Sequence, residues 1–251
     1  RSSNWKEGYE YTVATEMYSA GIDRLTHQPL SFSVSETTEG VHIHIIDAEL
    51  MGKGEKEKKD LYIEGVQNNG IINHYEYIIN SEGTIEIRHV LKPEGKMPLW
   101  FPRIGLTLTV SDALDQVKWY GRGPQENYPD RKTGYPTGIY ASTVQAMYEP
   151  YLMPQDYGLR TDVRWLQLTT DKGIGLQFKM NEWFNFNIYP YSTDNLTKAM
   201  YTYQLQKQKG MTLNLDYATT GVGCTARGVF GAYKAMPQEY RRTISIRPMM
   251  K

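Results

Sequence analysis

The sequence predicts an all-β fold, either a sandwich or a barrel, on three observations. Segments in which apolar and polar residues alternate recur along the chain, and such alternation is typical of strands with one buried and one open face. Turn-forming residues separate these segments about every ten residues. Most aromatic residues carry a polar tip, with 20 tyrosines and 5 tryptophans against 6 phenylalanines, and such residues suit strands and half-wet surfaces.

The first half of the chain contains many of the alternating segments. We expect strands at residues 9–14, 31–36, 41–46, 71–80 and 84–91. In the second of these, Phe32 and Val34 share one face. A charged run at 52–60 is typical of a solvated hairpin tip, and residues 61–66 continue from it.

The second half continues the pattern and adds one helix. Strands are expected at 100–110, 163–170, 175–180, 211–216 and 243–247, and the second and third of these form a hairpin. The only helix candidate is 192–200, with Ser192 or Thr193 as its N-cap. Because no repeat, linker or shift in composition divides the chain, we expect a single domain over residues 1–251.

Charge and composition exclude several classes of function. Lysine plus arginine balance aspartate plus glutamate at 28 each, so the chain lacks the basic surface that nucleic acid or an anionic membrane requires. No apolar run approaches the roughly 20 residues of a membrane span. The lone Cys224 excludes an internal disulfide. The chain starts without methionine or signal peptide, as expected of a fragment, and the bacterial cytoplasm and the periplasm both stay open as its location.

The most constrained stretch is residues 119–131, which reads WYGRGPQENYPDR. Gly121 and Gly123 permit backbone angles that are closed to other residues. Pro124 and Pro129 exclude a helix. We therefore expect a rigid loop that holds its polar side chains in fixed directions.

The acids of this stretch do not form a catalytic pair by spacing. Glu126 and Asp130 lie four residues apart, but the prolines remove the helix that would place them on one face, as a glycosidase pair would need. We expect Asp130 and Arg131 to brace the loop through charge-assisted hydrogen bonds. A phosphate loop at Gly121–Gly123 is also excluded, because no helix follows it.

Other candidate sites have simpler structural interpretations. His42 and His44 share one strand face and could chelate a metal, but no third ligand stands at a recognisable spacing, so structural strand histidines are favoured. No G-x-S-x-G motif is present, and Cys224 has no nearby histidine. Four aromatics beside the constrained loops could contact a sugar, although core packing is the favoured interpretation. They are Trp119, Tyr120, Tyr128 and Tyr157.

Five segments, in order, carry a resemblance to a known family. They are PRIG at 102–105, WYGRGPQENYPDR at 119–131, MYEPYLMPQDYGLR at 147–160, FNFNIYPYS at 184–192 and LNLDYATTGVG at 213–223. With them the chain resembles the C-terminal domain of family 2 glycoside hydrolases of the bacterial β-galactosidase type. The resemblance runs from about residue 5 to the end of the chain.

The resemblance implies a large antiparallel β-sandwich, the supersandwich that is shared with galactose mutarotase, with its first strands missing here. It also implies that the catalytic glutamates lie on a separate barrel domain. We therefore expect no catalytic residue, metal or cofactor in this chain, and Mg and Na in the barrel of the parent. The expected partners are that barrel and a galactoside or oligosaccharide, and the parent is expected to be a homo-oligomer.

Two loops would reach the sugar site by this resemblance. Gln155 and Asp156 fall where the family places a Ser-Glu pair near the site entrance. The position of the family's platform tryptophan falls near Arg227 or Gly228, where this chain has no aromatic, although Phe230 and Tyr233 are close in sequence. The constrained stretch becomes a structural signature loop, made of Trp119, Gly121, Gly123, Pro124, Glu126, Asn127, Pro129, Asp130 and Arg131. Tyr201 and Tyr203 stand where the lactase has histidines.

The expected function is therefore that of a non-catalytic domain. It would pack on the barrel of an enzyme that hydrolyses terminal non-reducing β-D-galactose residues, and would shape the entrance of the sugar site. The isolated chain is expected to be inactive. One alternative is an autonomous carbohydrate-binding module. Another is a mutarotase-like epimerase that acts through an acid and a histidine.

Overall fold

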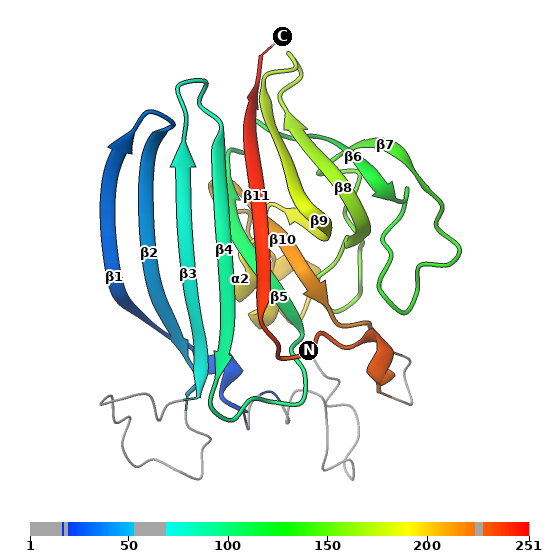
Figure 1. Ribbon diagram of the computed structural model, residues 1–251. Helices are drawn as coiled ribbons and strands as arrows, with labels where there is room; N and C mark the ends of the chain where they lie inside the picture. Colours follow the sequence, from blue (N-terminus) through cyan, green and yellow to red (C-terminus); the bar gives the residue numbers. More distant parts are fainter. Residues whose placement is uncertain (1–16, 18–19, 53–68, 224–227, 251) are drawn as a thin grey trace. The chain divides into compact units, whose positions relative to one another are not determined.

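A computed structural model describes residues 17, 20–52, 69–223 and 228–250 (Figure 1). The chain divides into two compact units. Unit 1 comprises Arg1–Phe101 and Met236–Thr243, and unit 2 comprises Pro102–Ala235 and Ile244–Lys251. The single domain over 1–251 stays a prediction. Several predicted features lie outside the described residues, namely the strands at 9–14 and 61–66, most of the charged run at 52–60, Cys224 and Arg227.

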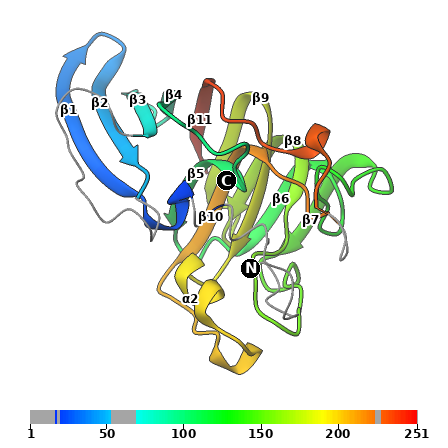
Figure 2. The same cartoon turned by 90° about the horizontal axis from the view of Figure 1, so that it is seen from below.

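Unit 1 is built on four long antiparallel strands, which confirms the strands expected at 31–36, 41–46, 71–80 and 84–91. They are β1 (Thr26–Thr37), β2 (Gly40–Leu50), β3 (Gly70–Ile79) and β4 (Ile85–Glu94), and each pairs with the next (Figure 1). The short 3₁₀ helix η1 (Ile22–Arg24) precedes them. The β1–β2 hairpin is curved (Figure 2). Gly40 follows its turn with a φ of 135°, which explains the glycine at that position.

One face of this sheet is partly buried, whereas most side chains of its edge strand β1 are exposed to solvent. Ile87 and Leu91 of β4 are buried, and their alternation with exposed Arg88 matches the expected pattern. Phe32 and Val34 on β1 share a face, as expected, but their side chains are 68% and 54% exposed. These two therefore add little to the core of unit 1.

Unit 2 contains the remaining strands. They are β5 (Arg103–Val110), β6 (Gln116–Arg122), β7 (Thr137–Thr143), β8 (Arg160–Thr169), β9 (Gly175–Tyr189), β10 (Met211–Thr219) and the last part of β11 (Tyr240–Met249). All of the pairings given for them are antiparallel. The all-β antiparallel fold class is thereby confirmed.

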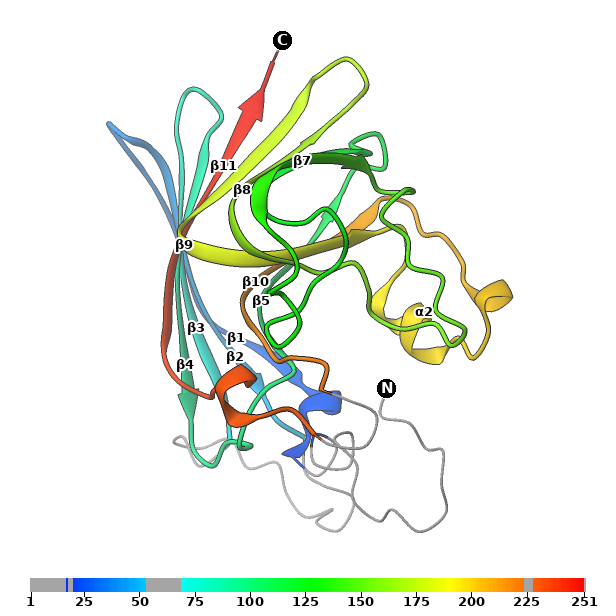
Figure 3. The same ribbon diagram turned by 90° about the vertical axis from the view of Figure 1, so that its right-hand side faces the viewer.

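Strand β9 organises unit 2. It pairs with β8 from Gly175 to Phe186. Its first residues, Gly175 to Met180, also pair with β11, and its last residues, Asn185 to Tyr189, pair with β10 (Figure 3). Strand β10 in turn pairs with β5. A strand that changes partners along its length brings side chains of β5, β9 and β10 together, and the candidate site lies there.

The predicted helix is present but shorter than expected. Helix α2 runs from Thr193 to Lys198, and the Ser192 hydroxyl accepts a hydrogen bond from the Asn195 amide at 3.0 Å. Ser192 is thus the N-cap. Leu196 of α2 packs against the buried rings of Tyr157 and Tyr189. The 3₁₀ helices η2 (Thr202–Gln204) and η3 (Gly231–Tyr233) follow later in the chain.

The signature stretch is corrected in one respect, because its first residues are a strand and not a loop. Strand β6 extends to Arg122. Val117, Trp119 and Gly121 are buried, while Lys118 and Tyr120 between them are exposed. This alternation was present in the sequence but was masked by the glycines and prolines that follow. No helix in the described part of the chain is long and apolar enough to cross a membrane.

Candidate functional site

Close packing explains why the signature loop has a tryptophan at position 119 and glycines at positions 121 and 123. Trp119 is fully buried, and its indole Nε1 donates to the Arg122 carbonyl at 3.0 Å. A Cβ on Gly121 would lie 2.8 Å from a Val163 methyl, and one on Gly123 would lie 2.8 Å from the Tyr140 ring. Both positions therefore exclude larger residues. Pro124 follows as an exposed residue.

Glu126 is the hydrogen-bonding centre of this loop. Its carboxylate is buried and accepts from the Tyr128 hydroxyl at 3.0 Å and the Gly158 amide at 2.8 Å. Arg131 donates to it at 3.3 Å, and the Tyr151 hydroxyl donates as well. Burial and the bond to Glu126 raise the pKa of Tyr151 to about 12. The loop is thereby joined to the segment around Gly158.

Asn127 strengthens the same junction. The residue is fully buried, and its backbone amide donates to the Leu159 carbonyl at 2.8 Å. Its side-chain oxygen accepts from the Thr161 amide at 3.1 Å, while its Nδ2 donates to the Gln125 carbonyl at 3.1 Å. Glu126 and Asn127 together hold the end of the PQDYG segment, residues 154–158, and the start of β8.

Pro129 and Asp130 occupy the middle of a tight turn. Tyr128 and Arg131 exchange backbone hydrogen bonds of 3.3 and 2.8 Å around them, and proline is favoured at the second position of such a turn. The Asp130 carboxylate accepts from the amides of Val222 and Gly223 at 3.0 and 2.7 Å. Asp130 thus ties the loop to the segment that ends just before Arg227.

Asp156 lies in a second set of contacts, on the other side of the PQDYG segment. Its Oδ1 accepts from Asn187 Nδ2 at 2.8 Å, the Tyr189 hydroxyl at 3.1 Å and Arg103 Nη1 at 3.4 Å. The Asp156 side chain is still 47% exposed. Gln155 beside it is half-buried. Asp156 is therefore positioned by three donors while it faces solvent.

Arg103 links Asp156 to a buried acid. Its Nη2 donates to Asp216 Oδ2 at 2.8 Å and to Asn187 Oδ1 at 3.3 Å. Asp216 is buried, and this burial, partly offset by Arg103, raises the pKa of the Asp216 carboxyl to about 6. The two aspartates raise the pKa of Arg103 in turn.

Asparagine and tyrosine side chains complete the network. Asn214 Nδ2 donates to Asn187 Oδ1 at 2.8 Å and to the Tyr189 hydroxyl at 3.0 Å, and it is oriented by a 2.8 Å bond from Thr107 to its oxygen. We call the whole group the Asp156 cluster. Its members are Arg103, Asp156, Asn187, Tyr189, Asn214 and Asp216.

Sequence reasoning identified Asp156 but missed the other members of the cluster. Arg103 lies in the PRIG segment, Asn187 in FNFNIYPYS and Asp216 in LNLDYATTGVG. These segments carried the family resemblance, but contacts between their polar residues were not predicted. Their polar residues, standing within apolar strands, were the available signal, since a polar group inside a predicted strand needs a partner.

The aromatic candidates divide into a buried and an exposed group. Trp119, Tyr128 and Tyr157 are buried, so the core packing favoured by the sequence is confirmed for them. Tyr201 and Tyr203 are 57% and 79% exposed, and their rings stack at 5.5 Å between centroids. Phe230 and Tyr233, which follow Arg227 in the sequence, are exposed.

The structure adds a neighbour to His42 and His44, while the expectation that they are structural strand histidines stays a prediction. The sequence offered no third ligand for His42 and His44, but Glu76 of β3 lies beside them, and one ligand atom from each of the three lies within 4.8 Å of the others. Strand pairing supplies this neighbour, at a sequence distance that no spacing rule covers.

Comparisons with known proteins agree with the motifs. The chain is 38% identical over 147 residues to a "Beta-galactosidase" of Priestia megaterium, covering 59% of this chain and 14% of that protein. It is 31% identical over 207 residues to a "Beta-galactosidase" of Vibrio cholerae, covering 82% of this chain and 18% of that protein. The chain thus matches less than a fifth of the length of these relatives.

Among solved structures, the chain is similar to a GalM/aldose epimerase homologue from C. elegans, with a TM-score of 0.42, 12% identity and coverage of 88% of this chain and 69% of that one. A putative aldose 1-epimerase from Escherichia coli K12 has a TM-score of 0.38 at 7% identity, with the same coverage, 88% and 69%.

The family described as the beta galactosidase small chain matches residues 4–246, which is nearly the whole sequence. The relatives above carry the same activity in their names. On this match, the chain belongs to the beta-galactosidase small-chain family.

Proposed function

We propose that this chain is the non-catalytic domain of a β-galactosidase, and that it packs on a separate catalytic barrel and shapes the entrance of the sugar site. The observation that carries the proposal is the placement of Asp156. The PQDYG segment is held through Glu126 and Gly158 on one side, and through Asn187 and Tyr189 on the other. A loop held in this way can present a carboxylate in a fixed position to a partner domain.

Asp156 has the chemistry to bind a sugar hydroxyl. Among the described residues, its three donors all contact Oδ1. The second oxygen, Oδ2, is therefore available as an acceptor on a half-exposed side chain. Hydrogen bonds that involve a charged group are stronger than neutral ones, so one such contact can orient a substrate.

Three acids in the described part of unit 2 have structural partners, which supports a non-catalytic role. A glycosidase needs two carboxyl groups that flank the scissile bond with room for the sugar between them. Glu126 is buried under four donors, and Asp130 is occupied by two backbone amides. Asp216 is buried against Arg103. The proposal places the catalytic glutamates, with Mg and Na, on the barrel of a homo-oligomeric parent.

The test has two parts. The chain alone is expected to show no hydrolysis of a chromogenic β-galactoside, and clear turnover would overturn the proposal. In the full-length protein that contains this chain, Asp156→Asn is expected to raise KM for the galactoside about 3–10-fold with a smaller change in kcat, as for the loss of one hydrogen bond. Asp171→Asn, in the exposed β8–β9 turn, is the matched control. An unchanged KM in Asp156→Asn would contradict the role of the cluster.

A second candidate function is an autonomous carbohydrate-binding module. The exposed stacked rings of Tyr201 and Tyr203 favour it, because aromatic faces pack against the C–H patches of sugars. Calorimetric titration of the chain with galactosides decides this case. Binding that is lost in the Tyr201→Ala/Tyr203→Ala variant would support the module, and no binding by the wild type would exclude it.

A further inference from the structure

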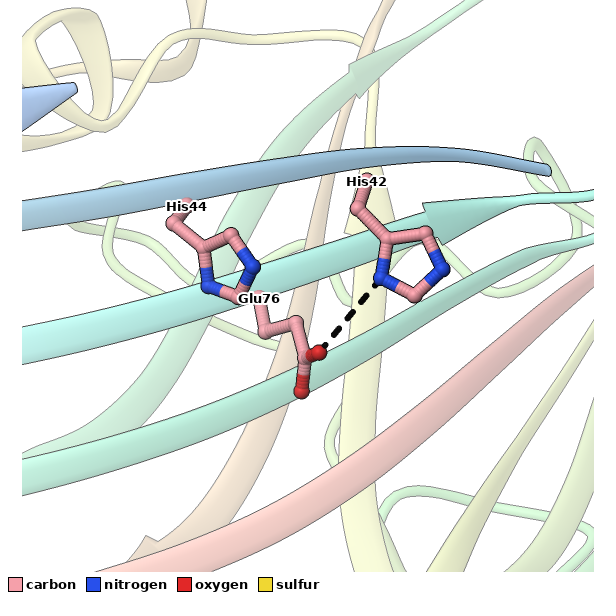
Figure 4. A group of neighbouring side chains, drawn as sticks. All are labelled: His42, His44 and Glu76. Carbon is pink, nitrogen blue, oxygen red and sulfur yellow. Dashed lines mark ion pairs between the residues drawn. The ribbon is translucent and has the colours of Figure 1, made fainter. Parts of the chain in front are cut away.

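The register of strands β2 and β3 places three potential metal ligands on one face of unit 1. His42 and His44 lie two residues apart on β2, so their side chains point to the same side. Glu76 of β3 is directly opposite His44 in the antiparallel pairing. Figure 4 shows the two imidazole rings and the Glu76 carboxylate turned toward one another.

The distances suit a small ion. One ligand atom from each of the three residues lies within 4.8 Å of the others. His42 Nδ1 and Glu76 Oε1 are 3.6 Å apart (Figure 4). Two ligands at zinc bond lengths of about 2.1 Å in a tetrahedron stand roughly 3.4 Å apart. Small side-chain rotations would therefore complete a coordination set, without movement of the strands.

Neighbouring charges hold the Glu76 carboxylate in place. Its second oxygen, Oε2, accepts from Arg88 Nη1 at 3.1 Å, and Arg88 Nε is bound by Glu86 at 2.8 Å. Arg88 belongs to β4 and lies directly opposite Glu76. Oε1 is thus the oxygen that is turned toward His42. Outer contacts of this kind commonly orient metal-binding carboxylates.

The other nitrogen of His42 supplies a second, independent observation. Its Nε2 is buried and has no hydrogen-bond partner among the described residues. The Glu39 carboxylate stands 3.9 Å away. If Nδ1 binds a metal, the ring proton resides on Nε2 and points toward an acid, which is the usual outer arrangement of a metal-bound histidine. An ion at Nδ1 would therefore fix the tautomer of this ring, with the proton on the nitrogen nearer to Glu39.

We propose that His42, His44 and Glu76 bind a divalent transition-metal ion of the Zn²⁺ class, with water at the remaining position. Two imidazoles and one carboxylate suit zinc, cobalt or copper, whereas Mg²⁺ and Ca²⁺ prefer oxygen ligands alone. The ion would cross-link β2 and β3 near the edge of the unit 1 sheet. The site shares no residue with the Asp156 cluster and does not depend on the proposed function.

The experiment is a calorimetric titration of the untagged, chelator-treated chain with ZnCl₂. We expect one equivalent to bind, and binding to weaken at least tenfold in His44→Gln and in Glu76→Gln. Both side chains are at least partly exposed, so these variants are expected to fold, and circular dichroism checks this. His27→Gln, on exposed strand β1, is the matched histidine control, and Cys224→Ser controls for binding by the thiol. Both controls are expected to keep wild-type affinity.

A second readout uses Co²⁺ as a spectroscopic probe. The wild type is expected to develop the visible absorption of a four-coordinate cobalt site, and the His42→Gln/His44→Gln variant is expected to lose it. The proposal is overturned if the wild type binds no Zn²⁺. It is overturned equally if affinity is unchanged in His44→Gln and Glu76→Gln, or if Cys224→Ser removes the binding.

Discussion

The signature loop of unit 2 and the histidine face of unit 1, which carries His42, His44 and Glu76, differ in how far their polar side chains are hydrogen-bonded. In the loop, Glu126 and Asp130 are saturated with donors from the neighbouring segments. On the histidine face, His42 has a buried nitrogen without a hydrogen-bond partner among the described residues, and His44 is exposed. A carboxylate that accepts several hydrogen bonds stabilises the fold, whereas ligand atoms with unused bonding capacity are available to bind an ion. In these two regions, fully hydrogen-bonded carboxylates belong to the structural framework, and polar groups with unused bonding capacity belong to a candidate site.

The largest expected effect is on the saturated side of this comparison. Glu126→Gln replaces an acceptor-only carboxylate with an amide whose NH₂ group faces donors, so we expect the free energy of unfolding to fall by about 2–4 kcal/mol. Urea denaturation measures this. Glu82→Gln at the exposed β3–β4 turn is the control and should be near neutral. If Glu126→Gln unfolded at the same urea concentration as the wild type, the hydrogen bonds to Glu126 would not stabilise the fold, and the contrast between the two regions would fail.

A pH titration tests the opposite face of the unit 1 sheet, where the histidine is buried rather than exposed. His89 is buried, its Nε2 lies 3.1 Å from Asn73 Oδ1, and its ring stacks on Tyr75 at 4.1 Å. Burial, with a smaller contribution from His74, lowers the pKa of His89 to about 4. The folded state therefore favours the neutral ring.

The sign of the pH effect follows from this shift. The contribution of His89 is complete above the unfolded pKa of about 6.5, and about 2–3 kcal/mol of stability is lost as the pH falls from about 6.5 to 4. The His89→Gln variant lacks this titration, so its stability curve should converge on that of the wild type in acid. Parallel curves for the two proteins over this range would contradict the assignment.

The turn of the signature loop should give a smaller effect. Pro129→Ala and Asp130→Ala are each expected to cost about 1–3 kcal/mol, since one loosens the turn and the other leaves the amides of Val222 and Gly223 without their acceptor. Thermal denaturation of both variants is the measurement, with Asp171→Ala at another turn as the control. Wild-type melting of both variants would show that this turn is not structural.

The smallest effect is expected at the open edge of unit 1. Phe32 is 68% exposed on β1, so Phe32→Thr should change the free energy of unfolding by less than about 0.5 kcal/mol, and threonine keeps the strand preference. Leu166→Ala on β8, where the side chain is fully buried, is the contrasting variant and should cost about 2–5 kcal/mol. A large loss in Phe32→Thr would show that the edge is covered in solution.

Local patterns predicted the elements well where a strand had a regular alternation. The β3–β4 segments, the β8–β9 hairpin and the Ser192 cap of α2 were all expected and are all present. Strand β6 was not predicted, because its second half lies in a stretch rich in glycine and proline, which is typical of a loop. The candidate site was predicted only at Asp156, since its partners are distant in sequence. Arg103 and Asp216, for example, are 113 residues apart.

The sequence by itself determined the all-β fold class, the family and the constrained character of the signature loop. These depend on the chemistry of neighbouring residues, on side-chain period and on motifs that can be read along the chain. The tertiary structure alone decided which polar groups meet. It placed Arg103 between Asp156 and Asp216, and it set Glu76 opposite His44. Such pairs depend on strand register and on long-range packing, which no local pattern encodes.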